Sequence, residues 1–200
     1  MCPASEAVEQ FASSALAFNL SPQRMVVEAL AKISIADVNV AYILATPPLA
    51  RQKTLYTHLV KFLGLKDQPV MKQFSLVLLS NLAQGDEAAS FLIGHQKMVI
   101  SHLVECLELV ESHARRNKVL PTPVAQNSFE DDPVMSVAML RRAAVTLHCL
   151  AKVTSNRDCF LECLDRILYL STSDYLEPSV SGIVMDLLFE LGKQPPTSSS

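Results

Sequence analysis

The chain has 200 residues, half of them hydrophobic, and a formal net charge of −3. This size and apolar content are sufficient for one sizeable core. The mildly acidic balance is not typical of a dedicated nucleic-acid-binding protein, and no apolar run approaches the roughly 18 residues of a membrane span.

Apolar residues recur at helical spacing along the chain, as in Leu55, Leu59, Phe62 and Leu63, and this predicts an all-α protein. The boundaries follow from capping signals, with Ser21-Pro22 at the start of one helix and Gly64 and Gly85 at the ends of two others. In chain order, we expect helices at about 6–19, 22–34, 37–45, 48–63, 69–84, a short one from 86, and then 98–113, 134–153, 157–171 and 178–191.

The apolar pattern repeats within the chain. Residues 58–63 resemble residues 102–107 at a shift of 44 (102 minus 58). A second set matches in three copies: Leu30, Ile33 and Ile43 with Leu79, Leu82 and Leu92, and with Leu147, Leu150 and Phe160. The shifts are 49 (79 minus 30) and 68 (147 minus 79), and residues 184–191 form a fourth, partial copy. The underlying period fits HEAT and armadillo units of roughly 40–47 residues.

These repeats predict an armadillo/HEAT-like helical solenoid of three to four repeats, in which Leu82, Leu103 and Leu150 are buried. We expect residues 1–21 to hold an N-terminal capping helix and residues 22–193 to form the repeat domain. An insertion at about 115–133, with three prolines and an acidic triplet, is expected to be a flexible loop. The Pro- and Ser-rich tail at 194–200 is expected to be disordered.

The five cysteines, an odd number without a signal peptide, favour reduced thiols in the cytosol or nucleus. Two pairs at i, i+4 could each place two zinc ligands on one helix face: His102 with Cys106, and Cys159 with Cys163. The alternative is that these cysteines are small core residues, which is the common role of buried cysteine. No C-x-x-C motif is present, so we expect neither a metal nor another cofactor.

Motifs of catalysis are also missing. The chain has no Gly-rich phosphate loop and no G-x-S-x-G motif. His148 and Cys149 are adjacent and diverge by about 100° on a helix, so they cannot pair as base and nucleophile. Asp37 and Asp86 follow equivalent helices, which favours capping over a carboxylate pair. We therefore expect a protein that is not an enzyme.

Most of the candidate binding residues are polar. Asn81 lies where armadillo repeats often carry an asparagine that binds a peptide backbone. Its equivalents in the other repeats are Lys32 and Cys149, so the row of asparagines that would bind an extended peptide is incomplete. The alternative binding mode is an apolar groove that holds a partner helix. Arg141, Arg142, Lys152 and Arg157 form a basic cluster that is either a solvated face or a contact for an acidic partner. The partner-binding candidates are Lys32, Asn81, Gln84, Phe129, Arg141, Arg142 and Lys152.

Four segments are more distinctive than a generic armadillo pattern: residues 33–48 with Ile-Leu-Ala-Thr-Pro-Pro, 79–86, 139–144 with Leu-Arg-Arg-Ala-Ala, and 184–192. Together they resemble the C-terminal armadillo-like domain of the Osa/BAF250 family, the large AT-rich-interaction-domain subunits of SWI/SNF chromatin remodellers. The resemblance covers about residues 22–192.

The resemblance implies a nuclear, non-catalytic scaffold that binds the helical region of the ATPase subunit and the core subunits and so supports transcription regulation. The family's DNA-binding module has no counterpart in this sequence, so we expect no direct nucleic-acid contact and no membrane contact from this chain. The alternative is an armadillo-repeat adaptor of another intracellular complex.

Overall fold

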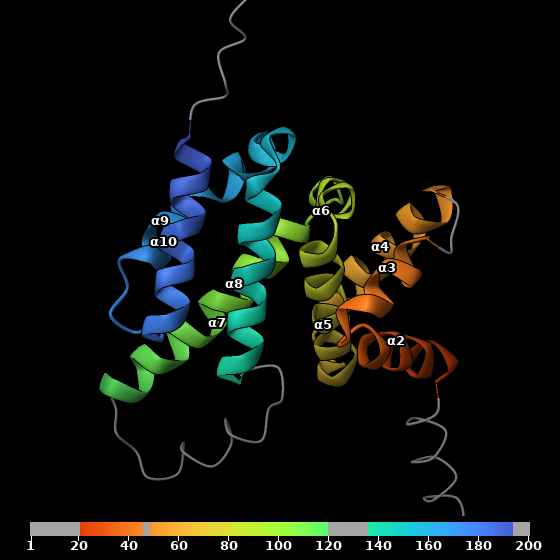
Figure 1. Ribbon diagram of the computed structural model, residues 1–200. Helices are drawn as coiled ribbons and strands as arrows, with labels where there is room; N and C mark the ends of the chain where they lie inside the picture. Colours follow the sequence, from red (N-terminus) through yellow and green to blue (C-terminus); the bar gives the residue numbers. More distant parts are fainter. Residues whose placement is uncertain (1–20, 46–48, 120–135, 194–200) are drawn as a thin grey trace, which may run out of the picture.

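The computed structural model describes residues 21–45, 49–119 and 136–193, and within these ranges it contains helices and no strand (Figure 1). The all-α prediction is confirmed. The expected capping helix at 6–19, most of the expected insertion, Phe129 and the tail at 194–200 lie outside the described residues.

The elements are α2 (Pro22–Ile33), α3 (Asp37–Ala45), α4 (Leu49–Leu63), α5 (Pro69–Gly85), α6 (Glu87–Gly94), α7 (Val99–Val119), α8 (Val137–Lys152), the 3-10 helix η1 (Thr154–Cys163), α9 (Leu164–Ser171) and α10 (Pro178–Gly192).

Several helices begin at a proline or at a capping side chain, whereas the predicted N-cap Ser21 makes no side-chain hydrogen bond to α2. Proline occupies the first turn of α2, α5 and α10, where its missing N–H costs nothing. The Asp86 carboxylate accepts a hydrogen bond from the Ala88 backbone N–H at 3.1 Å, so its predicted capping role is confirmed. Asp37 is instead the first residue of α3, where its charge favours the helix N-terminus. Ser136 caps α8 by accepting from the Met139 N–H at 3.3 Å.

The first helices of successive units pack on one another. Helix α5 contacts α2 on one side and α8 on the other, and α8 contacts α10. Figure 1 shows α5, α8 and α10 in front, and α7 and α9 contact each other behind them. The short elements α3, α6 and η1 link the two layers. The core of the described residues therefore lies between helices that pack on one another in succession.

Most of the predicted repeat positions lie in this core. Leu79, Leu82, Leu103, Leu147 and Leu150 are fully buried, as the repeat alignment predicts. Leu30, Ile43 and Leu92 are partly buried against them and Phe160 is buried.

Ile33 is the exception in the repeat alignment, because its side chain is 49% exposed. Among the described residues Ile33 is therefore not buried as its equivalent Leu82 is. Helix α2 buries Val27, Ala31 and Ser34 instead, which face the rest of the array. Among the described elements α2 is the first helix, and α5, which follows it, packs on one side of it.

Helix α7 is longer than predicted. The sequence suggested an end near His113, whereas the helix continues to Val119, so residues 115–119 of the expected insertion are helical. Arg115 is held by contacts that the sequence did not reveal (described below). The remainder of the expected loop, 120–133, lies outside the described residues, and its flexibility stays a prediction.

One glycine is required by close packing between units. The side chain of Asn156 is fully buried, and its Nδ2 donates to the backbone oxygens of Ser90 and Leu150, each at 3.0 Å. A Cβ atom on Gly94 would lie 2.4 Å from this Nδ2, closer than atoms can approach. Gly94 therefore allows η1 to pack directly against α6.

Tyr56 carries a hydroxyl that is buried and has no hydrogen-bond partner among the described residues. Burial, and to a lesser extent the charge of Asp86, raises the pKa of Tyr56 to about 12. The folded protein thus favours the neutral phenol more than the unfolded chain does. The stability associated with this group is fully present below pH 10 and is lost as the pH rises toward 12.

We expect Tyr56→Phe to be neutral or to stabilise the protein by about 1 kcal/mol at pH 7, because it removes an unpaired buried hydroxyl. Above pH 10 the wild-type protein should lose up to about 2–3 kcal/mol relative to Tyr56→Phe, at roughly 1.4 kcal/mol per pKa unit. Urea unfolding of both proteins between pH 7 and 11.5 measures the difference. If Tyr56→Phe is less stable than the wild-type protein at pH 7, the Tyr56 hydroxyl has a hydrogen-bond partner and the prediction is wrong.

Candidate protein-interaction surface

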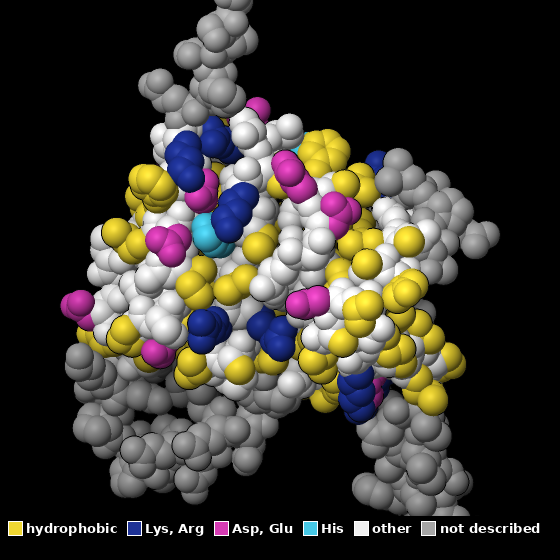
Figure 2. Space-filling view, in the orientation of Figure 1, with side chains coloured by type: hydrophobic (Ala, Val, Ile, Leu, Met, Phe, Trp, Pro, Cys, Tyr) yellow, Lys and Arg dark blue, Asp and Glu magenta, His cyan; other side chains and the backbone are white. Residues whose placement is uncertain are grey.

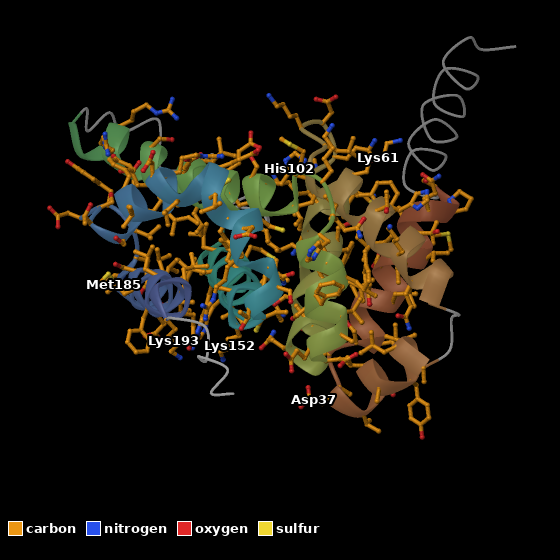
Figure 3. All side chains as sticks on the ribbon, turned by 90° about the horizontal axis from the view of Figure 1, so that it is seen from above. Asp37, Lys61, His102, Lys152, Met185 and Lys193 are labelled. Atoms are coloured by element: carbon orange, nitrogen blue, oxygen red, sulfur yellow. The ribbon has the colours of Figure 1, made fainter. Side chains whose placement is uncertain are left out.

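The described candidate residues come from the layer formed by α2, α5 and α8. Figure 3 shows Lys152 and Asp37 on one side of the molecule, whereas Lys61 and His102 lie on the other. Asn81 and Gln84 belong to α5, Lys32 to α2, and Arg141, Arg142 and Lys152 to α8.

Two of the candidates are joined in a polar chain across three helices. Arg142 Nη1 donates to Asn81 Oδ1 at 3.1 Å, and Asn81 Nδ2 donates to Ser34 Oγ at 2.9 Å. Ser34 Oγ in turn donates to the Ala31 carbonyl at 2.9 Å. Both polar atoms of Asn81 therefore have partners within the chain. This arrangement holds α2, α5 and α8 in register, and it gives Asn81 a structural role that the sequence reading did not consider.

Two hollows follow the ends of these helices. One of about 470 Å³ lies between α3 and α5, and its lining includes Asp37, Asn81 and Gln84. The next, of about 350 Å³, lies between α5, α6 and α8, and its lining includes Gln84, Cys149 and Lys152. Gln84 lines both, with its Nε2 bonded to Ser80 Oγ at 3.1 Å. The structure thus brings Asn81, Gln84 and Lys152 to consecutive grooves of one surface, here called the groove face.

The rim of the groove face carries mixed charge. Figure 2 shows a histidine between basic and acidic side chains over α8 and α10. The pKa of His148 is lowered, first by burial and then by Lys152, against the opposing influence of Asp186 and Glu190. His148 is thus favoured in its neutral form. Lys32 and Arg141 do not line the hollows, and Lys32 pairs with Glu28 at 2.6 Å.

The cysteines have the features of packing residues. Cys106 and Cys163 are buried, and Cys149 and Cys159 are partly buried. Burial is the main cause of the raised pKa of Cys106, Cys149 and Cys159, so their thiols favour the protonated form that neither attacks nor binds metal well. Within the described residues, no group of three or more His, Cys, Asp or Glu side chains could hold a metal ion. No helix in the described ranges is both long and apolar enough to cross a membrane.

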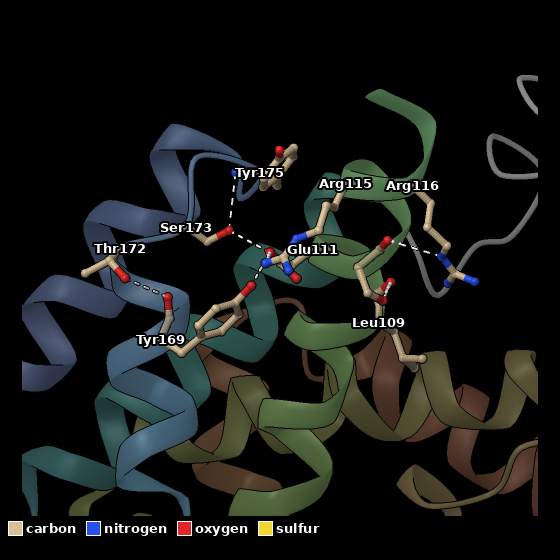
Figure 4. Close-up of polar contacts among 9 residues, drawn as sticks. Leu109, Glu111, Arg115, Arg116, Tyr169, Thr172, Ser173 and Tyr175 are labelled. Atoms are coloured by element: carbon tan, nitrogen blue, oxygen red, sulfur yellow. Dashed lines mark hydrogen bonds and ion pairs between the residues drawn. The ribbon is translucent and has the colours of Figure 1, made fainter. Parts of the chain in front are cut away.

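A polar cluster around the buried Glu111, where α7 meets α9, was not predicted from the sequence (Figure 4). Glu111 is 4% exposed and accepts hydrogen bonds from Arg115 at 2.5 Å, Tyr169 at 3.0 Å and Ser173 at 2.8 Å. The guanidinium of Arg115 lies 5.3 Å from the ring centres of both Tyr169 and Tyr175. This cluster ties the end of α7 to α9 and to the turn that follows it. Glu111 and Arg115 are spaced at i, i+4, but nothing in the sequence indicates that they meet tyrosines about 60 residues away.

Comparison with known proteins shows the family of this chain. The family described as "SWI/SNF-like complex subunit BAF250/Osa" matches residues 1–140. The chain belongs to the BAF250/Osa family. It is 34% identical over 196 residues to the Trithorax group protein osa of Drosophila melanogaster, a match that covers 96% of this chain and 7% of that protein. It is also 33% identical over 115 residues to the Trithorax group protein osa of Drosophila yakuba, covering 56% of this chain and 35% of that protein.

The resemblance identified in the sequence is thereby confirmed at the level of the family. The chain spans a small part of its D. melanogaster BAF250/Osa relative, so the match concerns one region of a much longer protein. The family is described as subunits of SWI/SNF-like complexes. The grooves between the packed helices of this BAF250/Osa chain are suited to contact with another protein.

Proposed function

We propose that this chain is an armadillo-like scaffold module of a SWI/SNF chromatin remodelling complex, acting in the nucleus in transcription regulation. The observation that carries the proposal is the match to osa along 96% of the chain. The stacked helices, in which α2, α5, α8 and α10 pack in succession, support the solenoid interpretation. The proposed partners are the helical region of the ATPase subunit and the core subunits, with DNA contacted only through the complex.

We further propose that the groove face is the surface for these partners. Its two hollows are adjacent and share Gln84, so they can hold consecutive side chains of one partner segment. Lys152 lines the second hollow and is exposed, which suits an acidic residue on the partner. Asn81 and Arg142 contribute by fixing the spacing of the helices rather than as free hydrogen-bonding groups.

The test compares two charge reversals on opposite sides of the molecule. Lys152→Glu should weaken binding to the ATPase helical region and core subunits by about tenfold in Kd, roughly 1.4 kcal/mol, because it places like charges in contact. Lys61→Glu makes the same charge change on the opposite side and should leave binding unchanged. Co-purification and titration with purified subunits measure both. Equal losses would contradict the groove face, and no binding by the wild-type chain would contradict the scaffold proposal.

A further inference from the structure

Helix α2 exposes an apolar stripe on the side that faces away from α5. Met25 and Val26 are 53% and 57% exposed, and Ala29 and Ile33 follow on the same face of the helix. Figure 2 shows hydrophobic side chains gathered at this end of the molecule. Four residues at this spacing form the kind of stripe by which a helix normally packs on a neighbour.

The equivalent residues of the later helices are buried. At the repeat shift of 49, Val26, Ala29 and Ile33 correspond to Ser75, Leu78 and Leu82 of α5. At the further shift of 68, they correspond to Ala143, Thr146 and Leu150 of α8. All six of these side chains are fully buried. The stripe on α2 therefore corresponds to a face that both α5 and α8 bury.

Both later helices have neighbours that precede them in the chain. Helix α5 is contacted by α2 and α4, and α8 by α5 and α7. The residues that precede α2 in this chain are 1–20. Residues 6–19 carry Val8, Phe11, Ala12 and Leu16 at helical spacing, with Gln10 on the opposite face.

We propose that residues 6–19 form a helix that packs on the Met25–Val26–Ala29–Ile33 stripe. The position of residues 6–19 in the chain favours them as the segment that covers the stripe, because only Leu20 separates them from Ser21, the N-cap of α2. So short a connection places two helices side by side. The lengths also agree: the segment would be about 21 Å long, and the 12 residues of α2 extend about 18 Å.

The chain contains no tryptophan, so a single introduced tryptophan reports the environment of one position. Phe11→Trp should fluoresce at shorter wavelength and be quenched less by acrylamide than Gln10→Trp, which places the probe on the opposite face. Adding Ala29→Asp to Phe11→Trp should shift the emission to that of an exposed tryptophan. Gln23→Asp adds the same charge to an exposed position of α2 outside the stripe and should leave the emission unchanged.

The full-length chain is used throughout, and circular dichroism verifies that each variant is folded. Equal quenching of Phe11→Trp and Gln10→Trp would overturn the proposal, because residues 6–19 would then not be docked. Burial of Phe11→Trp that increases with protein concentration would also overturn it, because a second copy would occupy the stripe. No partner subunit is present in this experiment, so its outcome is independent of the proposed scaffold function.

Discussion

Replacing Gly94 with alanine is expected to lower the free energy of unfolding by about 3 kcal/mol, and the Tm by roughly 6–12 °C for a chain of this size. The new Cβ would lie 2.4 Å from Nδ2 and 2.5 Å from Cγ of Asn156. Asn156 cannot move aside cheaply, because its Nδ2 holds two buried backbone carbonyls. Either η1 separates from α6 or both hydrogen bonds are lost.

A second glycine provides the matched control for Gly94→Ala. A Cβ on Gly182 of α10 would have no atom within 4 Å, so Gly182→Ala should stabilise the protein by about 0.5–1 kcal/mol through helix propensity. Combining Gly94→Ala with Asn156→Ala should cost less than the sum of the two single changes, because the second removes the clashing amide. Thermal and urea unfolding of the four variants measure these differences. Similar effects of the two glycine changes would show that the close approach at Gly94 is unimportant.

Leu82→Ala is expected to cost about 2–5 kcal/mol, the range for removing a large aliphatic side chain from a core. Leu82 is fully buried in α5, which contacts helices of the unit before and the unit after it. The cavity should therefore loosen both neighbours, and amide hydrogen exchange should accelerate in α2 and α8 as well as in α5.

The control for this change is Leu161→Ala, because Leu161 is 66% exposed. A substitution at such a surface position should alter stability by no more than about 0.5 kcal/mol. Chemical denaturation compares the two variants directly. Unchanged stability of Leu82→Ala would mean that the repeat register, and with it the equivalence of Leu82 and Leu150, is wrong.

The prediction from sequence was accurate where local signals are strong. The starts of three helices, at Pro22, Pro69 and next to Asp86, could be predicted because a proline or a capping side chain acts within the first turn of its own helix. The burial of Leu82, Leu103 and Leu150 follows from repetition, because equivalent residues in stacked units occupy equivalent environments. Ile33 is not buried like its equivalents, since no described helix covers the side of α2 on which it lies.

The candidate site was predicted less completely. The repeat alignment indicated Asn81, and a cluster of basic residues indicated Lys152. The structure places both, together with the candidate Gln84, around neighbouring hollows. The alignment could not show that Asn81 would be bonded to Arg142, because that contact depends on how α5 and α8 are rotated about their axes.

The sequence by itself determined the all-helical class, the caps, the repeated core positions and the BAF250/Osa family, because each is recorded in local spacing or in residue identity. Only the tertiary structure decided which polar groups meet. Glu111 with Tyr169, Arg142 with Asn81, and Gly94 with Asn156 join residues about 60 positions apart. Such contacts depend on the distance and rotation between packed helices, which result from the fit of the whole core and leave no periodic signal in the chain.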